Sequence, residues 1–568
     1  MAAPDSAEAI RLDRLSFAYA DQSDLALRDV SLTVARGEMI AVMGATGAGK
    51  TTLAKCLNRT VPAFQTGRLV GAIHILGRQL QAEGVADMAG IVGLVSQDFE
   101  AQLFATNVLQ EVVFGMEQLG VPPDEMRRRA PRALAAVGLQ GFEERDPSTL
   151  SGGEKQRLAI AATLALQPHV LVFDEPTTDL DPLGKLEIFA VLGAMRREGY
   201  TLVVIEHEIA AAEQADRLIV MSKGRIVCDD TPAKVLARAD FLLQHGVRPP
   251  DRSRVALAFG LHPPNSLDEA EAALRAVLPP RPGRPAGLRN LTTNNPTTNN
   301  LPSLSLIEAA NLSFEYESGA LALNDVSLRI NAGEFIALIG QNGSGKTTLA
   351  KHFNGLLHPK SGRVLLSGRD LRALPMNTVA ADVGYVFQNP DHQIFAATVT
   401  DEVAFGPRNF RLGGAEVTER VHGALEAVGL RGLEAVDPFL LGKGQRQRLA
   451  VASLLAMRPR LLILDEPTTG LDYDEQRRMM DLLARLHAEG LAILIITHSP
   501  WVVAEYAERG VLMSAGQILF DGALRDLFAE EALLARAHFH APEVTRLGRR
   551  FGFTPLSVGE FVEAMGKG

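Results

Sequence analysis

The sequence predicts an α/β protein built from two copies of one domain, each with a mostly parallel sheet that has helices on both faces. Three observations support this prediction. A glycine-rich pattern occurs twice, short apolar segments of strand length alternate with helical segments, and polar residues follow those apolar segments at matching offsets in both copies. Alternating strands and helices are typical of parallel sheets. A chain of 568 residues is long enough for two such domains.

The repeated pattern is G-x-x-x-x-G-K-[ST], which occurs at 44–51 and at 340–347. Its glycines let successive backbone N–H groups point at phosphate oxygens, and the helix that follows adds the positive end of its dipole. Lys50 and Lys346 are expected to reach the β- and γ-phosphates. A turn that binds nothing is the alternative, and the buried strand expected before each loop (39–43 and 335–339) argues against it. The nucleotide-binding residues predicted here are Gly44, Ala45, Thr46, Gly47, Ala48, Gly49, Lys50, Thr51, Thr52, Gly340, Gln341, Asn342, Gly343, Ser344, Gly345, Lys346, Thr347 and Thr348.

Carboxylate pairs end two later apolar segments, as Asp174-Glu175 and Asp465-Glu466. Acids at the C-terminal edge of a parallel sheet suit Mg²⁺ binding and the activation of water. The first acid of each pair is expected to hold Mg²⁺ together with the hydroxyl of Thr51 or Thr347. The second acid, Glu175 or Glu466, is expected to orient or deprotonate the attacking water. Helix caps or turn acids are the structural alternative.

Histidines and glutamines end further strands of the predicted sheets. His207 and His498 each follow the aspartate by 33 residues (207 − 174 and 498 − 465), which favours γ-phosphate sensors over ordinary structural histidines. Gln97 and Gln388 follow apolar segments, and a glutamine at a strand end can reach both Mg²⁺ and a mobile loop. The predicted Mg²⁺ ligands are therefore Thr51, Gln97, Asp174, Thr347, Gln388 and Asp465.

The repeat also sets the predicted domain limits. The offsets 388 − 97, 465 − 174 and 498 − 207 all equal 291, and similar residues recur in the two tails, which predicts a small C-terminal helical extension in each copy. A segment rich in Pro and then in Asn and Thr separates the copies and is typical of a tether. The predicted domains are 1–278 and 304–568, with a linker at 279–303.

Together these residues resemble the ATP-binding cassette (ABC) ATPases, which are P-loop NTPases, over nearly the whole of both copies. The match includes the LSGGE signature at 150–154, which lies in a helical subdomain of that family, and Asp181 and Asp472 after the carboxylate pairs. Tyr19 and Tyr316 resemble the aromatic residue on which the family stacks adenine, with a plain strand aromatic as the alternative. The resemblance implies ATP and Mg²⁺ as cofactors. It also implies that the two domains pair head to tail within the chain, with ATP between one phosphate loop and the other domain's signature.

The residues after each glutamine narrow the resemblance. Gln388-Asn-Pro-Asp-His-Gln-Ile-Phe395 is similar to the energy-coupling factor (ECF) ATPases, which drive importers of vitamins and metal ions, and 97–104 is a looser version. In that family this region receives helices of a membrane-embedded coupling subunit, which works with a substrate-binding membrane subunit. Phe104 and Phe395 are therefore candidate apolar anchors, with packing inside the helical subdomain as the alternative. The expected location is the cytoplasmic face of the cell membrane, as a peripheral protein.

The second signature differs from the first. The first copy has Ser151, Gly152 and Gly153, whereas the second has Gly442, Lys443 and Gly444. Gly442 lacks the hydroxyl that would reach the γ-phosphate, and Lys443 is a cation where family members have glycine. With head-to-tail pairing this altered signature faces Lys50. We therefore predict two ATP sites with unequal hydrolysis, faster at Lys346.

Composition excludes several other classes. A net charge of −10 argues against a nucleic-acid partner, and two cysteines, Cys56 and Cys228, provide no disulfide framework or metal cluster. No apolar run is long enough to span a membrane, and no secretory signal is visible. The rival interpretations are the tandem ATPase of a sugar-type ABC importer, a soluble ABC factor acting on ribosomes or DNA, and a scaffold that does not hydrolyse ATP. Both intact Asp-Glu pairs argue against the scaffold.

Overall fold

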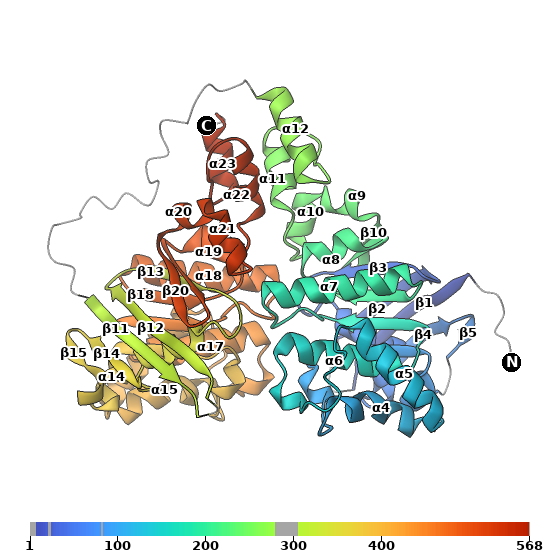
Figure 1. Cartoon of the computed structure of the whole chain (residues 1–568), viewed down its shortest axis with the longest axis horizontal. Helices are drawn as coiled ribbons and strands as arrows, with labels where there is room; N and C mark the ends of the chain where they lie inside the picture. The colour runs from blue at the N-terminus through green and yellow to red at the C-terminus, as the bar shows by residue number, and fades with distance from the viewer. Residues whose placement is uncertain (1–6, 21–23, 81–82, 279–304, 318, 567–568) are drawn as a thin grey trace. The chain divides into compact units, whose positions relative to one another are not determined.

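The computed structural model describes residues 7–20, 24–80, 83–278, 305–317 and 319–566. The chain forms two compact units (Figure 1). The first contains the described residues up to Arg254 together with Asp472–Asp474, and the second contains Val255–Leu471 and the chain from Glu475 onward. The predicted linker at 279–303 lies outside the described residues. The predicted domain limits therefore stay a prediction.

The main sheet of the first unit has six strands in the order β10-β9-β3-β8-β7-β6. All neighbours are parallel except β10, which is antiparallel to β9. The central strands are fully buried because both faces of the sheet are covered. This confirms the predicted α/β class with a mostly parallel sheet. The strands are β3 (Met39–Met43), β6 (Val92–Val95), β7 (Val170–Asp174), β8 (Thr201–Ile205), β9 (Arg217–Ser222) and β10 (Arg225–Asp230).

A second, antiparallel sheet, which the sequence did not predict, covers one face of the main sheet together with a helix. Its order is β2-β1-β4-β5, with β1 (Glu8–Tyr19), β2 (Leu27–Ala35), β4 (Gly67–Ile75) and β5 (Arg78–Gln79). Inward side chains such as Leu12 and Val34 share one core with Ile40 and Val172 of the main sheet and with helix α1 (Lys50–Leu57). Alternating buried and exposed residues on β2 are typical of a strand with one covered face.

Helices cover the other face of the main sheet. Met43, Phe173 and Val204 point into this second core, which also contains residues of the helical subdomain formed by α4, α5 and α6. The helices are α2 (Thr60–Ala63), α3 (Val85–Met88), α4 (Val108–Gln118), α5 (Pro123–Ala136), α6 (Gly152–Ala165), α7 (Pro182–Arg197), α8 (Ile209–Gln214), α9 (Pro232–Leu236) and α10 (Ala239–Gln244), with 3₁₀ turns η1 (Glu100–Gln102) and η2 (Pro147–Thr149).

The second unit repeats this architecture. Its sheets have the orders β12-β11-β14-β15 and β16-β17-β18-β13-β19-β20. The strands are β11 (Ser305–Glu315), β12 (Leu321–Asn331), β13 (Phe335–Ile339), β14 (Ser361–Leu366), β15 (Arg369–Asp370), β16 (Val383–Val386), β17 (Leu461–Asp465), β18 (Ala492–Ile496), β19 (Arg509–Ser514) and β20 (Gln517–Ala523). The helices are α13 (Lys346–Phe353), α14 (Met376–Asp382), α15 (Val399–Asn409), α16 (Gly414–Ala427), α17 (Lys443–Leu455), α18 (Tyr473–Ala488), α19 (Pro500–Tyr506), α20 (Leu524–Ala529) and α21 (Glu531–Arg536), with η3 (Leu371–Ala373), η4 (Pro390–His392) and η5 (Pro438–Leu440).

The helical extensions of both copies pack into one cluster that belongs to the second unit. Val255 of α11 (Asp251–Ala258) and Leu274 of α12 (Leu267–Val277) share this cluster with Leu547 of α22 (Glu543–Arg550) and Phe561 of α23 (Val558–Ala564). Arg550 adds ion pairs to Asp268 (2.6 Å) and Glu271 (3.1 Å) on α12. The extension of the first copy is thus buried against that of the second.

Candidate functional site

Each phosphate loop joins the central strand of a main sheet to the helix that starts at its lysine. Lys50 Nζ donates to the carbonyl oxygens of Gly44 (2.8 Å) and Ala45 (3.1 Å), and Lys346 Nζ donates to those of Gly340 (2.8 Å) and Gln341 (2.7 Å). Both ammonium groups are therefore held at the mouth of their own loop. Burial lowers the pKa of Lys50, while the negative charges of Glu175 and Asp174 act in the opposite direction.

Glycine is required where this loop enters its helix. Gly49 has φ +98°, and a Cβ at this position would lie 2.5 Å from the carbonyl oxygen of Ala26. Gly345 repeats this geometry with φ +100° and 2.4 Å to the carbonyl oxygen of Ala322. Any side chain would both strain the backbone and push the loop away from the neighbouring strand.

The threonine and the aspartate predicted as Mg²⁺ ligands meet in both units. Thr51 Oγ1 donates to Asp174 Oδ1 at 3.2 Å, and Thr347 Oγ1 donates to Asp465 Oδ2 at 2.8 Å. A hydroxyl and a carboxylate at one sheet edge, beside a phosphate loop, are oxygen donors of the kind that Mg²⁺ accepts. Among the described residues, no group of three or more His, Cys, Asp or Glu side chains forms a metal site. This result does not conflict with a site whose donors are a threonine, one aspartate and phosphate oxygens.

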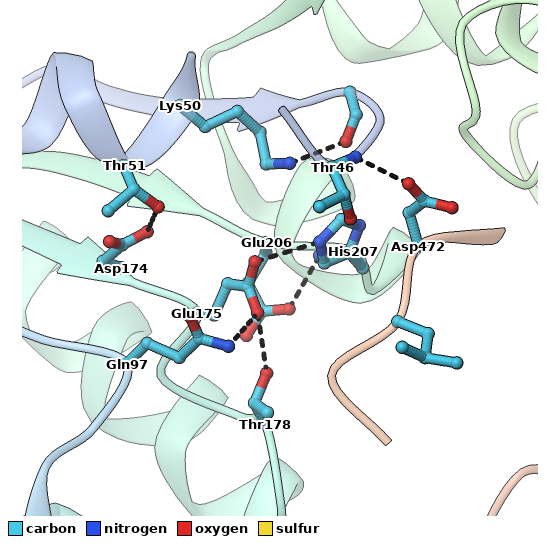
Figure 2. Close-up of polar contacts among 12 residues, drawn as sticks. Thr46, Lys50, Thr51, Gln97, Asp174, Glu175, Thr178, Glu206, His207 and Asp472 are labelled. Carbon is cyan, nitrogen blue, oxygen red and sulfur yellow. Dashed lines mark hydrogen bonds and ion pairs between the residues drawn. The ribbon is translucent and has the colours of Figure 1, made fainter. Parts of the chain in front are cut away.

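Glu175 is the centre of a polar cluster in the first unit (Figure 2). Its Oε2 accepts from Gln97 Nε2 (3.0 Å) and Thr178 Oγ1 (3.2 Å), and its Oε1 lies 3.1 Å from His207 Nε2. Burial raises the pKa of Glu175, but the hydrogen bond and charge of His207 and the charge of Lys50 outweigh it, so the net pKa is lowered. The structure thus brings two predicted site residues, Gln97 and His207, into contact with the carboxylate of Glu175.

Asp174 has the opposite electrostatic balance. Burial and the neighbouring charge of Glu175 raise the pKa of Asp174 to about 6, against smaller opposing effects from Thr51 and Lys50. Two adjacent buried acids cannot both ionise at low cost. A cation bound at this edge would offset the cost of ionising Asp174.

The corresponding cluster of the second unit is arranged differently. His498 Nε2 lies 3.0 Å from Glu466 Oε1 and 3.0 Å from Asn342 Oδ1 of the phosphate loop. Gln388 is exposed, unlike Gln97, which is half-buried and bonded to Glu175. Both histidines therefore contact the predicted base of their own unit. Of the two glutamines, which both belong to the described residues, Gln97 hydrogen-bonds to that base and Gln388 does not.

The two tyrosines proposed for adenine stacking lie beside the phosphate loops. The hydroxyl of Tyr19 is 3.0 Å from Thr52 Oγ1, and that of Tyr316 is 2.9 Å from Thr348 Oγ1. Each ring also packs edge-on against the phenylalanine two residues earlier, Phe17 or Phe314. The structure places both residues where either role, stacking platform or strand aromatic, is compatible with the contacts.

The signature residues begin α6 and α17 and do not join the polar clusters of their own units. Ser151 Oγ accepts from Glu154 N (3.3 Å), and Glu154 Oε2 accepts from Ser151 N (2.7 Å), which is a reciprocal cap. At the start of α17, Gln445 Oε1 accepts from Gly442 N at 3.0 Å, and glycine has no hydroxyl for the reverse bond. The altered signature thus removes half of the helix cap as well as the predicted phosphate contact.

Lys443 lies against the loop that follows the carboxylate pair of its own unit. A Cβ at Gly470 would lie 2.2 Å from Lys443 Nζ, so the ammonium of Lys443 lies directly beside the backbone of Gly470. The first copy has Asp179 at the position equivalent to Gly470 and Gly152 at the position equivalent to Lys443. The two copies therefore differ at both positions of this contact.

Sequence reasoning missed two buried polar residues of the sites. Tyr385 on β16 donates its hydroxyl to Asp465 Oδ2 at 2.8 Å, and the first copy has Leu94 there. Burial, and then the charge of Asp465, raise the pKa of Tyr385. Glu206, directly after β8, accepts hydrogen bonds from Thr177 and His207 in the two loops that flank Glu175, and the second copy has Thr497 at this position. Comparing the copies residue by residue at the strand ends would have found both.

Exposed phenylalanine pairs lie on the segment after each glutamine. Phe104 and Phe114 are 62% and 38% exposed with ring centres 4.5 Å apart, and Phe395 and Phe405 are 60% and 47% exposed with centres 4.7 Å apart. In each unit a buried glutamate holds the first phenylalanine. These bonds are Glu111 Oε2 with the N–H of Phe104 (2.9 Å) and Ala105 (2.8 Å), and Glu402 Oε2 with that of Phe395 (3.0 Å) and Ala396 (2.9 Å).

Comparison with known proteins gives a consistent picture. The family described as ABC transporter matches residues 27–178 and 323–469. An ABC transporter ATP-binding protein of Caldanaerobacter subterraneus subsp. tengcongensis is 45% identical over 557 residues, covering 96% of this chain and 97% of the relative. A protein of Methanosarcina acetivorans with the same description is 40% identical over 556 residues, covering 96% and 90%.

A solved structure of cbiO1 from Clostridium perfringens, described as part of the ABC transporter complex cbiONQ, is also similar. It is 34% identical with a TM-score of 0.39, and the match covers 44% of this chain and 99% of that one. Within the described ranges, no helix has the length and apolar character needed to span a membrane.

Proposed function

Because this chain belongs to the ABC transporter family and is a tandem ATP-binding protein with ATPase activity, we propose that it energises an ECF-type importer of vitamins or metal ions. The observation that supports this proposal is the pair of exposed phenylalanines in each unit, on the segment that resembles ECF ATPases. Exposed aromatic side chains on a held backbone are typical anchors for a protein partner. The partners would be a membrane-embedded coupling subunit and a substrate-binding membrane subunit, at the cytoplasmic face of the membrane.

The glutamates beneath these loops support a binding role over incidental exposure. Glu111 and Glu402 are only 4% and 3% exposed, and each uses one carboxylate oxygen to accept from two consecutive backbone N–H groups. Burying a carboxylate is costly unless its hydrogen bonds are satisfied. In both copies a buried glutamate therefore fixes the backbone from which the exposed phenylalanine projects.

We propose roles in hydrolysis for the site residues, and the contacts described above support them. The phosphate-loop N–H groups and the buried ammonium of Lys50 or Lys346 would hold the β- and γ-phosphates. Glu175 and Glu466 would orient the attacking water, and the adjacent His207 and His498 would contact the γ-phosphate. Mg²⁺, held by the threonine and aspartate pairs, would neutralise charge on the phosphates.

ATP can do mechanical work here only through different affinities for open and closed states of the paired domains. We propose that the domains close head to tail on binding ATP and reopen after hydrolysis. The Lys50 site then receives Gly442, Lys443 and Gly444, and the Lys346 site receives Ser151, Gly152 and Gly153. Loss of one neutral donor costs about 1 kcal/mol, which favours faster hydrolysis at the Lys346 site.

Purification of the tagged chain from membranes, with identification of bound subunits by mass spectrometry, tests the proposal. We expect a coupling subunit and a substrate-binding subunit to be recovered. The combined change Phe104→Asp and Phe395→Asp should reduce their recovery at least tenfold, while Phe64→Asp, at another exposed phenylalanine (76% exposed), should not. Recovery of ribosomes or DNA in place of membrane subunits would overturn the proposal, and so would equal recovery with both variants.

A further inference from the structure

Glu206 is a buried carboxylate at the first site that the hydrolysis mechanism above does not use. It lies directly after β8, which ends at Ile205, and before His207, and it is only 2% exposed. Its Oε1 accepts from the N–H (2.9 Å) and the hydroxyl (2.5 Å) of Thr177, and its Oε2 accepts from the N–H of His207 (2.9 Å) and of Glu208 (3.3 Å). Both carboxylate oxygens are therefore occupied by donors from the surrounding loops.

These four hydrogen bonds connect the two loops that flank Glu175. Thr177 lies in the loop after β7, two residues beyond Glu175, and His207 and Glu208 begin the loop after β8. The neighbour of Thr177, Thr178, donates to Glu175 Oε2, and His207 Nε2 contacts Glu175 Oε1 (Figure 2). Glu206 thus fixes the backbone next to two of the groups that contact the predicted base.

In the second unit, the equivalent position at this sheet edge has no carboxylate. Thr497 takes the place of Glu206, is fully buried, and its Oγ1 accepts from Ser499 N (3.1 Å) within its own loop. Among the described residues, Thr497 makes no hydrogen bond to Thr468, which is the equivalent of Thr177. His498 instead contacts Asn342 of the phosphate loop. Since the two units share one fold, a carboxylate is not needed to fold this edge.

A glutamate with only a structural role would have a high desolvation cost at this position. Moving an ionised carboxylate out of water costs free energy that only strong hydrogen bonds or charges offset. Threonine performs the structural task in the second copy without that cost. A direct catalytic role is also excluded by geometry, because both carboxylate oxygens accept from loop donors and almost none of the residue is exposed.

We propose that Glu206 is a positioning residue of the first ATP site, which holds the loops of Thr177 and His207 together so that His207 and Thr178 keep Glu175 oriented for water activation. It acts through its neighbours and does not touch the nucleotide. The second site has Thr497 in place of Glu206, so the two sites differ in how His207 and His498 are held as well as in the signature that each is proposed to receive. The inference rests on the ATPase activity and not on the identity of the transporter.

Kinetics of the full-length chain test this proposal. The variant Glu466→Gln serves as background, because it leaves the first site as the main source of hydrolysis. In this background Glu206→Thr, which introduces the residue of the second copy, should lower kcat about tenfold and change KM for ATP less than twofold. Thr177→Val, which removes one of the four donors and preserves shape, should lower kcat to a smaller extent with KM again unchanged.

A double-mutant comparison separates positioning from a structural role. When His207→Ala is already present, Glu206→Thr should lower kcat by only about threefold further, because one of the two groups through which it acts is gone and only the contact of Thr178 remains. Glu38→Gln is the matched control. Glu38 is a largely buried acid that accepts from Ala35 N (2.7 Å) before β3, at the opposite end of the sheet, and its change should leave kcat within twofold.

Three results would overturn the proposal. The first is an unchanged kcat in Glu206→Thr, and the second is a tenfold decrease that persists in the presence of His207→Ala. The third is an increase in KM together with a large fall in melting temperature, because that combination shows a structural role. If Glu206→Thr does not fold, the same kinetic measurements are made on Thr177→Val. An unchanged kcat in Thr177→Val then contradicts the proposal.

Discussion

At the scale of single residues, the two sites are chemically similar but not equivalent. Asp174 receives one hydroxyl donor, from Thr51, whereas Asp465 receives two, from Thr347 and Tyr385. A carboxylate that accepts more hydrogen bonds is better held and more easily ionised. The sheet edge predicted to bind Mg²⁺ therefore has more hydrogen bonds to its aspartate in the second unit than in the first.

The raised pKa of Asp174 predicts a pH-dependent loss of stability. Its folded-state pKa is about 6, against about 3.9 in an unfolded chain. The folded protein thus holds this proton more tightly, so the stabilisation is complete below about pH 4 and is lost as the pH rises through 6. Asp174→Asn should stabilise the nucleotide-free chain by up to about 3 kcal/mol at pH 7.5 and by only about 1 kcal/mol near pH 4.5.

Urea unfolding at the two pH values measures this difference. Asp124→Asn, at an exposed acid on α5, should change stability by less than about 0.5 kcal/mol at either pH. A variant Asp174→Asn that is less stable than the natural chain at pH 7.5 would contradict the prediction.

Tyr385 predicts a second difference between the sites. Tyr385→Phe removes one donor from Asp465 and preserves packing, which should cost about 1 kcal/mol, or about a fivefold decrease in kcat/KM. We expect this decrease in a Glu175→Gln background, where hydrolysis comes from the second site. Tyr506→Phe, whose hydroxyl bonds Asp481 outside the site, is the control and should have no effect. An unchanged kcat/KM in Tyr385→Phe would show that Asp465 does not depend on this bond.

At the scale of elements, the parallel strands and the loops at their C-terminal ends bring the site together. Gln97 follows β6, Glu175 follows β7 and His207 follows β8, and these three strands are neighbours in one sheet. Residues far apart in sequence therefore meet at a single sheet edge. The C-terminal helices, in contrast, join the two copies. Helices α11 and α12 of the first copy pack against α22 and α23 of the second.

This shared helical cluster predicts coupled stability of the two extensions. Leu547 is fully buried in the cluster, and Leu547→Ala should cost about 2–5 kcal/mol locally. Hydrogen exchange should then increase in α11 and α12 as well as in α22 and α23. Leu257→Ala, at a leucine of α11 that is 42% exposed, should leave exchange nearly unchanged. Faster exchange confined to α22 and α23 would contradict a single cluster.

At the scale of the whole molecule, the duplication supplies two complete sets of ATP-site residues in one chain. Both Asp-Glu pairs and both histidines are present, so neither site lacks its predicted catalytic group. Because the copies are fused in one chain, each can differ in sequence from the other. The differences at the sites described above include the signature, Glu206 and Tyr385. The copies are therefore expected to do unequal work.

Unequal hydrolysis is tested in the chain assembled with its membrane partners. Glu466→Gln should reduce ATPase activity more than Glu175→Gln does, because the Lys346 site is expected to face the intact signature. Steady-state phosphate release measures both variants under the same conditions. Equal losses from the two changes would argue against an asymmetry that originates in Gly442 and Lys443.

The sequence alone determined the fold class, the duplication and most candidate site residues, because motif spacing and strand-length apolar segments are local properties of the chain. Only the tertiary structure decided which strand ends meet, that an antiparallel sheet covers one face, and that Phe104 and Phe395 are exposed. It also showed that Tyr385 and Glu206 bond to the site, since a lone buried tyrosine or glutamate carries no motif. Such contacts depend on which strands become neighbours, and that order is set by packing over the whole domain.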